Sequence, residues 1–300
     1  GDGVQDLVAP STRGPLKAIS GATGEPIWET TIDTDRRDLF VHRATAGDAP
    51  RFATDVGATD LDKDGTPDLL LAAGEDDYRE KLPVVIAVSG RTGRRIWRTD
   101  FIVQKFRTPL LLECRDLDGD GEAEIVLVAP ADFGLAVRDY VTIGSKEVRL
   151  WLVALSGRDG RMRWSQPLTE SQQADSGGMG YQFRRARLQA AYADLDGDGV
   201  DDVLLPAQRA PGDRSLDLRA FSGSDGRLLW RLPLPNLVNK RDSFIEVPSA
   251  TAGDLDKDGR PEVIIPSLAK SPDEQGRPMD VLRIQTLDGS TGGVRWQWET

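Results

Sequence analysis

Short apolar runs, each bounded by Gly, Pro or acidic residues, set the pattern of hydrophobic and polar positions along this chain. Four of them are rich in Leu, Ile and Val and directly follow an acidic segment: 68–73, 124–129, 202–206 and 262–266. Runs of this length and composition predict β-strands. None approaches the roughly 18 apolar residues that a membrane span requires. The pattern therefore predicts an all-β protein.

A second element, Gly-x-x-Gly-x-x-x-Trp, lies between such runs and occurs five times. Alternating segments flank it, as at 84–89 before one copy and 94–98 after it. Glycine supplies the positive φ that a tight hairpin turn requires, so each copy predicts a strand, a turn and a second strand. The copies are Gly21/Gly24/Trp28, Gly90/Gly93/Trp97, Gly157/Gly160/Trp164, Gly223/Gly226/Trp230 and Gly289/Gly292/Trp296.

Five of the seven tryptophans share this one phase. An indole repeated once per unit can either stack on a ligand or pack one unit against the next. A binding site needs only one or two such residues, whereas burying an indole at every boundary stabilises a repeat protein. We therefore expect Trp97, Trp164 and Trp230 to be buried between neighbouring repeats. Trp28 and Trp296, in the end repeats, are expected to contribute less.

An acidic loop with carboxylates at positions 1, 3, 5 and 9 and glycine at position 6 precedes each of the four apolar runs. Such oxygen ligands suit calcium, a hard cation that accepts many flexible oxygen ligands from a short loop. A fifth copy, at the start of the chain, is truncated, with Asp2 and Asp6 at positions 5 and 9. The complete copies predict Ca²⁺ ligands at Asp60, Asp62, Asp64, Asp68, Asp116, Asp118, Asp120, Glu124, Asp194, Asp196, Asp198, Asp202, Asp254, Asp256, Asp258 and Glu262.

Two other interpretations of the acidic loops are a solvated turn and an EF-hand. Asp and Gly favour turns, but a turn does not require carboxylates at the same four positions in four copies. An EF-hand has a bidentate Glu at position 12 and a helix after the loop. Position 12 here is Leu71, Leu127, Leu205 or Ile265, and a strand-like run follows the loop. The loops are therefore expected to connect two strands of one sheet.

The glycine at loop position 6 recurs at residues 3, 65, 121, 199 and 259 and defines five repeats. Each is expected to contain a strand before the loop, one after it and two around the hairpin turn. Small residues before the loops, as at 189–193 and 249–253, suit an innermost strand near a crowded axis. Four antiparallel strands repeated around an axis make a β-propeller. The expected repeats are 1–51, 52–107, 108–185, 186–245 and 246–300, in a single domain, 1–300.

The first repeat lacks the inner strand and the start of the loop. Propellers close by letting one terminus complete the blade at the other end, which removes exposed sheet edges. No strand follows Trp298 to do so. We therefore expect these five repeats to be part of a longer propeller of about six to eight blades, flanked by further domains in a longer chain.

Charge and rare residues exclude several classes of function. The chain carries 38 basic and 49 acidic residues, and the loop carboxylates largely explain its formal net charge of −11. Such an acidic protein is a poor partner for nucleic acid, which attracts basic patches. Cys114 is the single cysteine, which excludes an internal disulfide and predicts a small core residue. With His42 as the single histidine, no catalytic constellation is evident.

Both motifs resemble known propeller repeats. The acidic loops resemble the FG-GAP repeat of integrin α-type propellers, also called VCBS, in which the loop between the first two strands of a blade holds calcium. Elements such as Ser20-Gly-Ala-Thr-Gly24 with the following Trp28 resemble the turn and docking tryptophan of pyrroloquinoline-quinone (quinoprotein) propellers. Together these resemblances cover nearly the whole chain and imply a calcium-binding propeller with a role such as cell adhesion. The adjacent cysteine pair of quinoprotein dehydrogenases is missing.

We expect an extracellular or envelope-facing module that binds a protein or carbohydrate ligand, because millimolar calcium outside the cell fills loops of modest affinity. The longest segments between motifs, 31–51, 130–150 and 165–182, are the candidates for ligand contact. The alternative is a propeller that scaffolds a carbohydrate-active enzyme, such as a polysaccharide lyase or hydrolase. No catalytic residue is assigned, and neither a nucleic-acid partner nor membrane insertion is expected.

Overall fold

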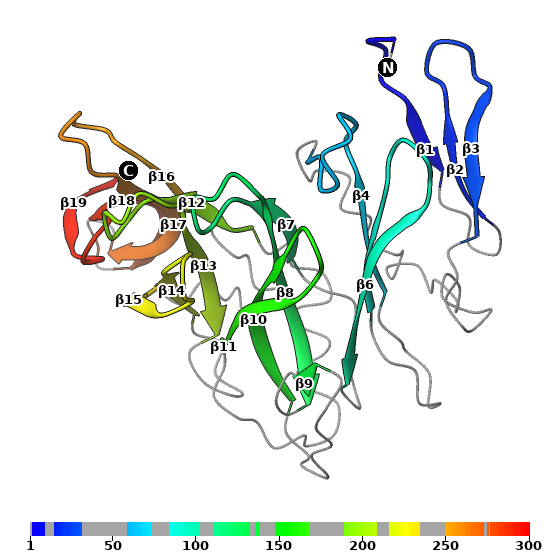
Figure 1. The fold of residues 1–300 in the computed structure, drawn as a ribbon. Helices are drawn as coiled ribbons and strands as arrows, with labels where there is room; N and C mark the ends of the chain where they lie inside the picture. The colour runs from blue at the N-terminus through cyan, green and yellow to red at the C-terminus, as the bar shows by residue number, and fades with distance from the viewer. Residues whose placement is uncertain are drawn as a thin grey trace. The chain divides into compact units, whose positions relative to one another are not determined.

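The computed structural model describes residues 2–9, 15–31, 59–73, 84–102, 111–132, 136–137, 148–168, 189–208, 216–234, 250–272, 275 and 277–300. Within these ranges every regular element is a β-strand, and the strands form five separate sheets (Figure 1). The predicted all-β fold of small sheets is therefore confirmed.

The chain divides into two compact units. The first comprises residues 1–114, 122–145 and 153–163, and the second comprises 115–121, 146–152 and 164–300. The first two repeats thus belong to the first unit and the last two to the second, while the third repeat contributes to both.

The sheet of the first repeat has three strands, in the order β1-β2-β3. Leu7 pairs with Ile19 and Leu16 with Thr30, and both pairings are antiparallel. Among the described residues, no strand occupies the inner position of this sheet, as expected for this repeat. The strands are β1 (Leu7–Ala9), β2 (Leu16–Ile19) and β3 (Pro26–Thr30).

The third, fourth and fifth repeats each form a four-stranded sheet in which one strand precedes the acidic loop, one follows it and two flank the hairpin turn. This is the predicted order. The strands are β7 (Leu111–Arg115), β8 (Glu124–Asp132), β10 (Val148–Ser156) and β11 (Met162–Pro167); β12 (Ala191–Ala193), β13 (Asp202–Gln208), β14 (Leu216–Phe221) and β15 (Leu228–Pro233); and β16 (Thr251–Gly253), β17 (Glu262–Pro272), β18 (Pro278–Asp288) and β19 (Val294–Glu299).

The sheet of the second repeat is completed by a strand from another repeat. It has the order β4-β5-β6-β9, and β9 comes from the segment 130–150 of the third repeat, one of the three long segments named as candidates for ligand contact. Phe101 and Ile102 at the end of β6 pair with β9. Part of this segment is therefore a strand, and it covers what would otherwise be a free edge of β6. The strands are β4 (Leu69–Ala73), β5 (Val84–Val88), β6 (Arg95–Ile102) and β9 (Ala136–Val137).

Several sequence-based expectations lie outside the described residues. They concern residues 56–58 of the inner strand expected at 56–59, His42, most of the segment 31–51 and residues 169–182. Thr59, at the border of the first of these, accepts a hydrogen bond from the Asp68 amide at 3.0 Å.

The hairpin turns have the same backbone geometry in every repeat. In the fourth, the Gly226 amide donates to the Ser222 carbonyl at 2.9 Å, and the Ser222 amide donates to the Arg227 carbonyl at 2.8 Å. Gly226 has φ +76°, and the pairing of β14 with β15 shifts register between Ala220 and Phe221. A turn followed by a left-handed glycine and a bulge is a common hairpin solution, and it explains the spacing of the glycine pair.

Each docking tryptophan reaches the turn of the following repeat. The indole Nε1 donates to the carbonyl of the first turn glycine at 2.5–2.8 Å in four pairs, and Trp97, Trp164 and Trp230 are at least 91% buried. Packing between repeats is therefore confirmed for these three. The four donor–acceptor pairs are Trp28–Gly90, Trp97–Gly157, Trp164–Gly223 and Trp230–Gly289.

Trp28, in the first repeat, is only partly buried, in line with the smaller contribution expected of it, but it still docks on Gly90 with a 2.7 Å hydrogen bond. Docking runs from each repeat to the next along the chain, so the first tryptophan has a following turn to meet. Trp296, in the last repeat, has 51% of its surface exposed. The two ends are therefore not equivalent.

A leucine at position 2 of the acidic loops packs at the same boundaries. Leu61, Leu117 and Leu195 are at least 91% buried, and their Cδ2 atoms lie close to the first turn glycine of the next repeat. The matching Leu255 of the last repeat is 50% exposed. The three boundaries at Gly157, Gly223 and Gly289 therefore each have two apolar contacts, an indole and a leucine, on one glycine turn.

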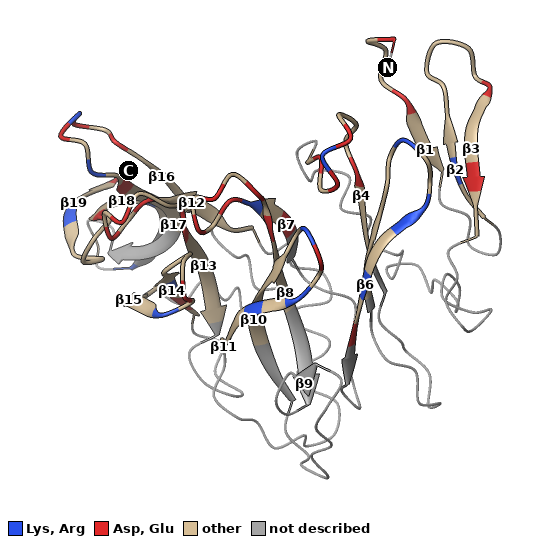
Figure 2. Cartoon of the chain, viewed as in Figure 1, with Lys and Arg blue, Asp and Glu red and all other residues tan. Residues whose placement is uncertain are grey.

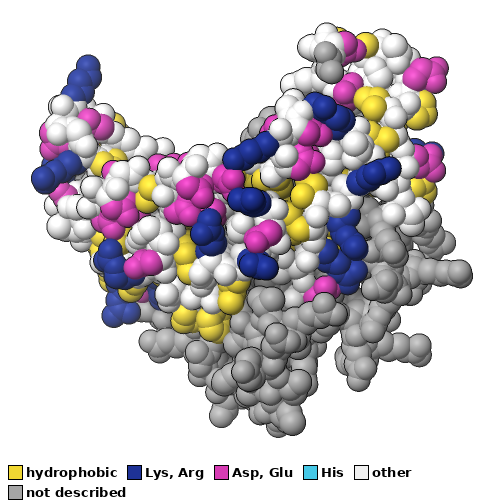
Figure 3. All heavy atoms as spheres, viewed as in Figure 1, with side chains coloured by type: hydrophobic (Ala, Val, Ile, Leu, Met, Phe, Trp, Pro, Cys, Tyr) yellow, Lys and Arg dark blue, Asp and Glu magenta, His cyan; other side chains and the backbone are white. Residues whose placement is uncertain are grey.

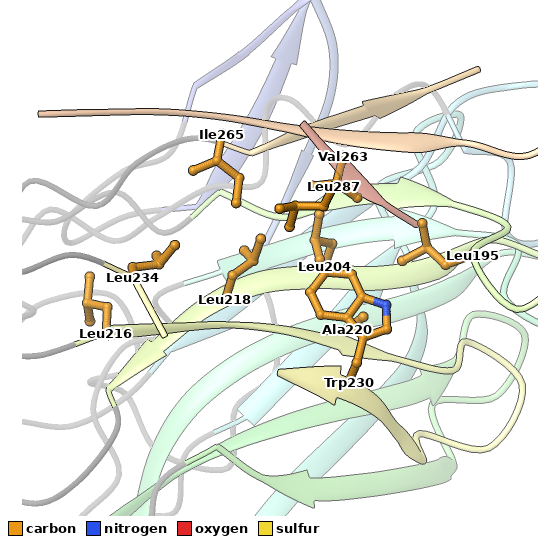
Figure 4. Packing of buried hydrophobic residues seen from close by; sticks show 10 residues of the cluster. All are labelled: Leu195, Leu204, Leu216, Leu218, Ala220, Trp230, Leu234, Val263, Ile265 and Leu287. Atoms are coloured by element: carbon orange, nitrogen blue, oxygen red, sulfur yellow. The ribbon is translucent and has the colours of Figure 1, made fainter. Parts of the chain in front are cut away.

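The core lies between neighbouring sheets. Strand β13 is buried along both faces, with Val203, Leu204 and Leu205 all at 1% exposure or less. In the cluster shown in Figure 4, Trp230 of β15 lies with Leu204 and Ala220 of its own sheet, while Val263 comes from the next sheet. Cys114 is buried, as predicted for a small core residue.

Replacing Trp97, Trp164 or Trp230 with Ala should lower the free energy of unfolding by roughly 3–5 kcal/mol in each variant. Removing the buried indole leaves a cavity and a carbonyl without its hydrogen-bond donor. Trp296→Ala, at an exposed position, should cost less than about 1 kcal/mol. Denaturant unfolding of the four variants provides the test. A loss at Trp296 as large as at the others would show that it is buried too.

The second turn glycine should be replaceable where no indole covers it. A Cβ at Gly226 would lie 2.5 Å from Cε3 of Trp164, whereas Gly24, with φ +75°, has nothing within 4 Å. Gly24→Ala should cost only the left-handed strain of about 1–2 kcal/mol. Gly226→Ala should cost about 1–3 kcal/mol more, because the methyl overpacks the boundary. Adding Trp164→Ala to Gly226→Ala should cost less than the sum of the two, and strict additivity would contradict the contact.

Candidate metal centres

The acidic loops are held in shape by their own carboxylates. In the fourth repeat, Asp194 accepts the amides of Gly197 and Gly199 at 2.7 and 3.0 Å. Asp198 accepts the amide of Val200 at 3.0 Å. The bond from position 1 to the position-6 glycine recurs in the other complete loops, where Asp60, Asp116 and Asp254 accept that amide at 2.7, 3.0 and 3.0 Å. The sequence spacing therefore encodes a defined loop, which is not a loose solvated turn.

The position-9 carboxylate is buried and ties the loop to the hairpin turn of its own repeat. Asp202 is fully buried and accepts the amides of Leu195 and Gly223 at 2.8 and 3.0 Å. Asp68 accepts the Gly90 amide at 2.9 Å in the same way. In the truncated first loop, Asp6 accepts the Gly21 amide at 3.1 Å, which confirms its assignment to position 9.

Carboxylates at positions 1, 3 and 9 converge in each complete loop. In every cluster one carboxylate oxygen from each residue lies within 4.8 Å of the others. Each oxygen has two lone pairs, so a backbone hydrogen bond leaves capacity for a cation. Asp and Glu are concentrated in these loops, for example before β4 and β13 (Figure 2). The clusters are Asp60/Asp62/Asp68, Asp116/Asp118/Glu124, Asp194/Asp196/Asp202 and Asp254/Asp256/Glu262.

The predicted ligands at position 5 are placed differently from the other three. Asp64 and Asp258 each accept the amide two residues further on at 2.8 Å, like Asp198 in the fourth repeat. The convergent sets in the four complete loops consist of positions 1, 3 and 9. The fourth predicted ligand of each loop, at Asp64, Asp120, Asp198 and Asp258, thus stays a prediction.

Burial raises the pKa of the position-9 aspartates. The pKa of Asp202 is raised to about 6 because burial disfavours its charged form, while the amides of Gly223 and Leu195 act in the opposite direction. Burial likewise raises the pKa of Asp68. A cation bound nearby would favour the charged form of these carboxylates and so offset the free-energy cost of ionising them in a buried position.

Arginines that sequence analysis did not single out face the loops. Arg227 lies 3.2 Å from Asp196, and Arg163 lies 3.6 Å from Glu124. Arg295 ion-pairs with three carboxylates of the loop 254–262. Basic side chains accordingly lie beside acidic ones on the surface (Figure 3). The convergent carboxylates fit a cation, and in the loop 254–262 a guanidinium already lies among them.

The sequence held a signal for these arginines. The residue before the docking tryptophan is Arg163 or Arg295 in the two repeats with Glu at loop position 9. In the repeats with Asp at that position it is an aliphatic residue, as in Ile96 and Leu229. The longer acidic side chain and the arginine thus occur together.

Comparison with known proteins supports a propeller of the quinoprotein type. A PQQ-repeat family model described as "Outer membrane protein assembly factor BamB" matches residues 80–300. Protein FAM234B of Gallus gallus is 27% identical over 160 residues, which are 53% of this chain and 21% of that protein. The chain therefore matches about a fifth of the length of this relative.

Two solved structures are partly similar to this chain. Quinohemoprotein alcohol dehydrogenase from Comamonas testosteroni is 13% identical with a TM-score of 0.41, and the match covers 98% of this chain and 41% of that one. Rhamnogalacturonan lyase PL11 of Bacillus licheniformis is 17% identical with a TM-score of 0.43, covering 95% and 59%. Among the described residues there is no helix of the length and apolarity needed to cross a bilayer.

The raised pKa of Asp202 predicts how stability depends on pH without metal. The folded state holds its proton up to pH of about 6, whereas the unfolded chain releases it near 3.8. The free energy of unfolding in chelator should therefore fall as the pH rises through this window, by up to about 3 kcal/mol. Asp202→Asn should flatten the fall, and Asp201→Asn, at the neighbouring acid, should not. Equal slopes in all three proteins, measured by urea unfolding, would contradict the shift.

Proposed function

This chain belongs to the PQQ-type propeller family described as outer membrane protein assembly factor BamB, and from this premise we propose that it is a calcium-stabilised β-propeller acting as a binding module at the cell envelope or outside the cell. The observation that carries the proposal is the convergence of three carboxylates in each complete acidic loop. The loop spacing resembles FG-GAP/VCBS repeats, and the turns and tryptophans match the quinoprotein type.

Positions 1, 3 and 9 would hold the ion. In the loop 194–202 these are Asp194, Asp196 and Asp202. A bound Ca²⁺ supplies positive charge to carboxylates whose mutual repulsion otherwise opposes folding. The chain's own backbone amides orient the same carboxylates, so much of the site is formed before the ion binds. Preorganisation of this kind reduces the entropy cost of binding.

The ion would act on the boundary between repeats as well as on the loop. Asp202 holds the amide of Gly223, whose carbonyl receives the Trp164 indole at 2.8 Å. A cation that fixes Asp202 therefore also fixes the turn on which the preceding repeat docks. In this role calcium would be a structural ion that keeps the scaffold rigid, and a rigid scaffold positions the loops that bind a ligand.

Calcium should raise the melting temperature of the chain, and excess chelator should lower it. Free calcium at 100 times the dissociation constant contributes about 2.7 kcal/mol for each independent site. Asp194→Asn with Asp196→Asn should remove one site, measured as one fewer ion per chain by equilibrium dialysis. Asp225→Asn, an exposed acid of the same repeat outside the loop, is the matched control. A melting temperature that is unchanged in chelator would contradict the proposal.

The ligand class is tested with the calcium-loaded chain on a glycan array and against polysaccharide substrates. Retained binding without turnover supports a carbohydrate-binding module, and absence of glycan binding points to a protein partner. Release of reducing or unsaturated sugar ends would instead support the alternative, a propeller that scaffolds a carbohydrate-active enzyme.

A further inference from the structure

One arginine in the last repeat is surrounded by carboxylates. The Arg295 guanidinium lies 2.9 Å from Asp256 and 3.8 Å from Asp258, and it also forms a short hydrogen bond with Glu262. These residues occupy positions 3, 5 and 9 of the loop 254–262, and two of them belong to its convergent cluster. The arginine thus contacts two of the three carboxylates that a metal in this loop would use.

The strand geometry directs this side chain toward the loop. The register of β18 and β19 shifts between Thr286 and Leu287, which pair with Trp296 and Val294. Arg295 is therefore the extra residue of a bulge, and bulges change the direction of a side chain relative to regular strand alternation. Leu229 is the equivalent bulge residue in the fourth repeat, where the loop has Asp at position 9.

A further acidic residue faces Arg295 in this repeat alone. The residue before the first turn glycine is serine in the other four repeats and Asp288 in the last. Asp288 accepts hydrogen bonds from Ser290 and Thr291, and its second oxygen lies 3.8 Å from Arg295 Nε. In the last repeat, the longer side chain of Glu262 and the additional acid Asp288 therefore both contact the Arg295 guanidinium.

We propose that Arg295 is the resident cation of the loop 254–262 and closes this loop to calcium. The inference rests on the proposed function, since it removes the loop 254–262 from the four complete loops that would take a metal. A metal entering this loop would have to displace a guanidinium held by several charge-assisted hydrogen bonds. Because arginine keeps its charge at all pH values relevant to proteins, the block is permanent and is not a pH switch.

Counting bound calcium by equilibrium dialysis tests the block. The natural chain should bind no more than three ions, and Arg295→Gln should bind one more than the natural chain. Asp256→Asn should leave the count of the natural chain unchanged and should abolish the gain in Arg295→Gln. Arg283→Gln, which removes an arginine of the same sheet that pairs with Glu299 instead of the loop, should not change the count. An ion lost on Asp256→Asn alone, or no gain in Arg295→Gln, would overturn the inference.

A stability measurement in chelator tests the arginine independently of metal. Without Arg295 the surrounding carboxylates repel one another, so Arg295→Gln should melt at least roughly 2–4 °C lower. Arg295→Lys, which keeps the charge, and Arg295→Gln combined with Glu262→Gln should both recover part of the loss. An unchanged melting temperature in Arg295→Gln would overturn the inference even if no loop binds calcium. Loss of an ion on Asp196→Asn is the separate test of the proposed function.

Discussion

The rest of the structure depends on one hydrogen bond, from a tryptophan indole to the carbonyl of a glycine in the next repeat. A small sheet on its own buries too little apolar surface to be stable. The indole gives each sheet a large apolar group that fits only where the neighbouring turn has no side chain, as at Gly226. The hydrogen bond then fixes the position of that turn. Stability in this protein is therefore mostly a property of pairs of repeats.

The acidic loops and the boundaries share residues, which links charge to packing. Gly223 donates its amide to Asp202 and accepts the Trp164 indole at its carbonyl, while Leu117 packs against its Cα. The loop carboxylate and the docked indole thus bind the amide and the carbonyl of the same glycine. A change in the charge of Asp202 can therefore alter the hydrogen bond at the boundary between repeats. In the last repeat Arg295 also supplies positive charge to two carboxylates of the loop 254–262.

Local spacing in the sequence was enough to predict the strands, the turns and the converging carboxylates. Those features depend on residues fewer than ten positions apart, and their periodicity revealed them. The direction of docking could not be predicted. The regular spacing of residues such as Trp28 and Trp296 does not show whether each indole contacts the preceding or the following repeat. Strand β9 was missed since its two residues pair with a distant β6. Arg295 was missed because its carboxylate partners lie 7 to 39 positions away.

Because each docking tryptophan contacts the turn of the following repeat, the contacts at one boundary are equivalent to those at another. Every internal boundary uses the same donor on one side and the same acceptor on the other, so a duplicated repeat would find a compatible neighbour without new contacts having to evolve. Strand β9 is the exception, because the third repeat lends it to the sheet of the second. These two repeats must therefore be inherited together, and gain or loss of a unit is least disruptive elsewhere in the array.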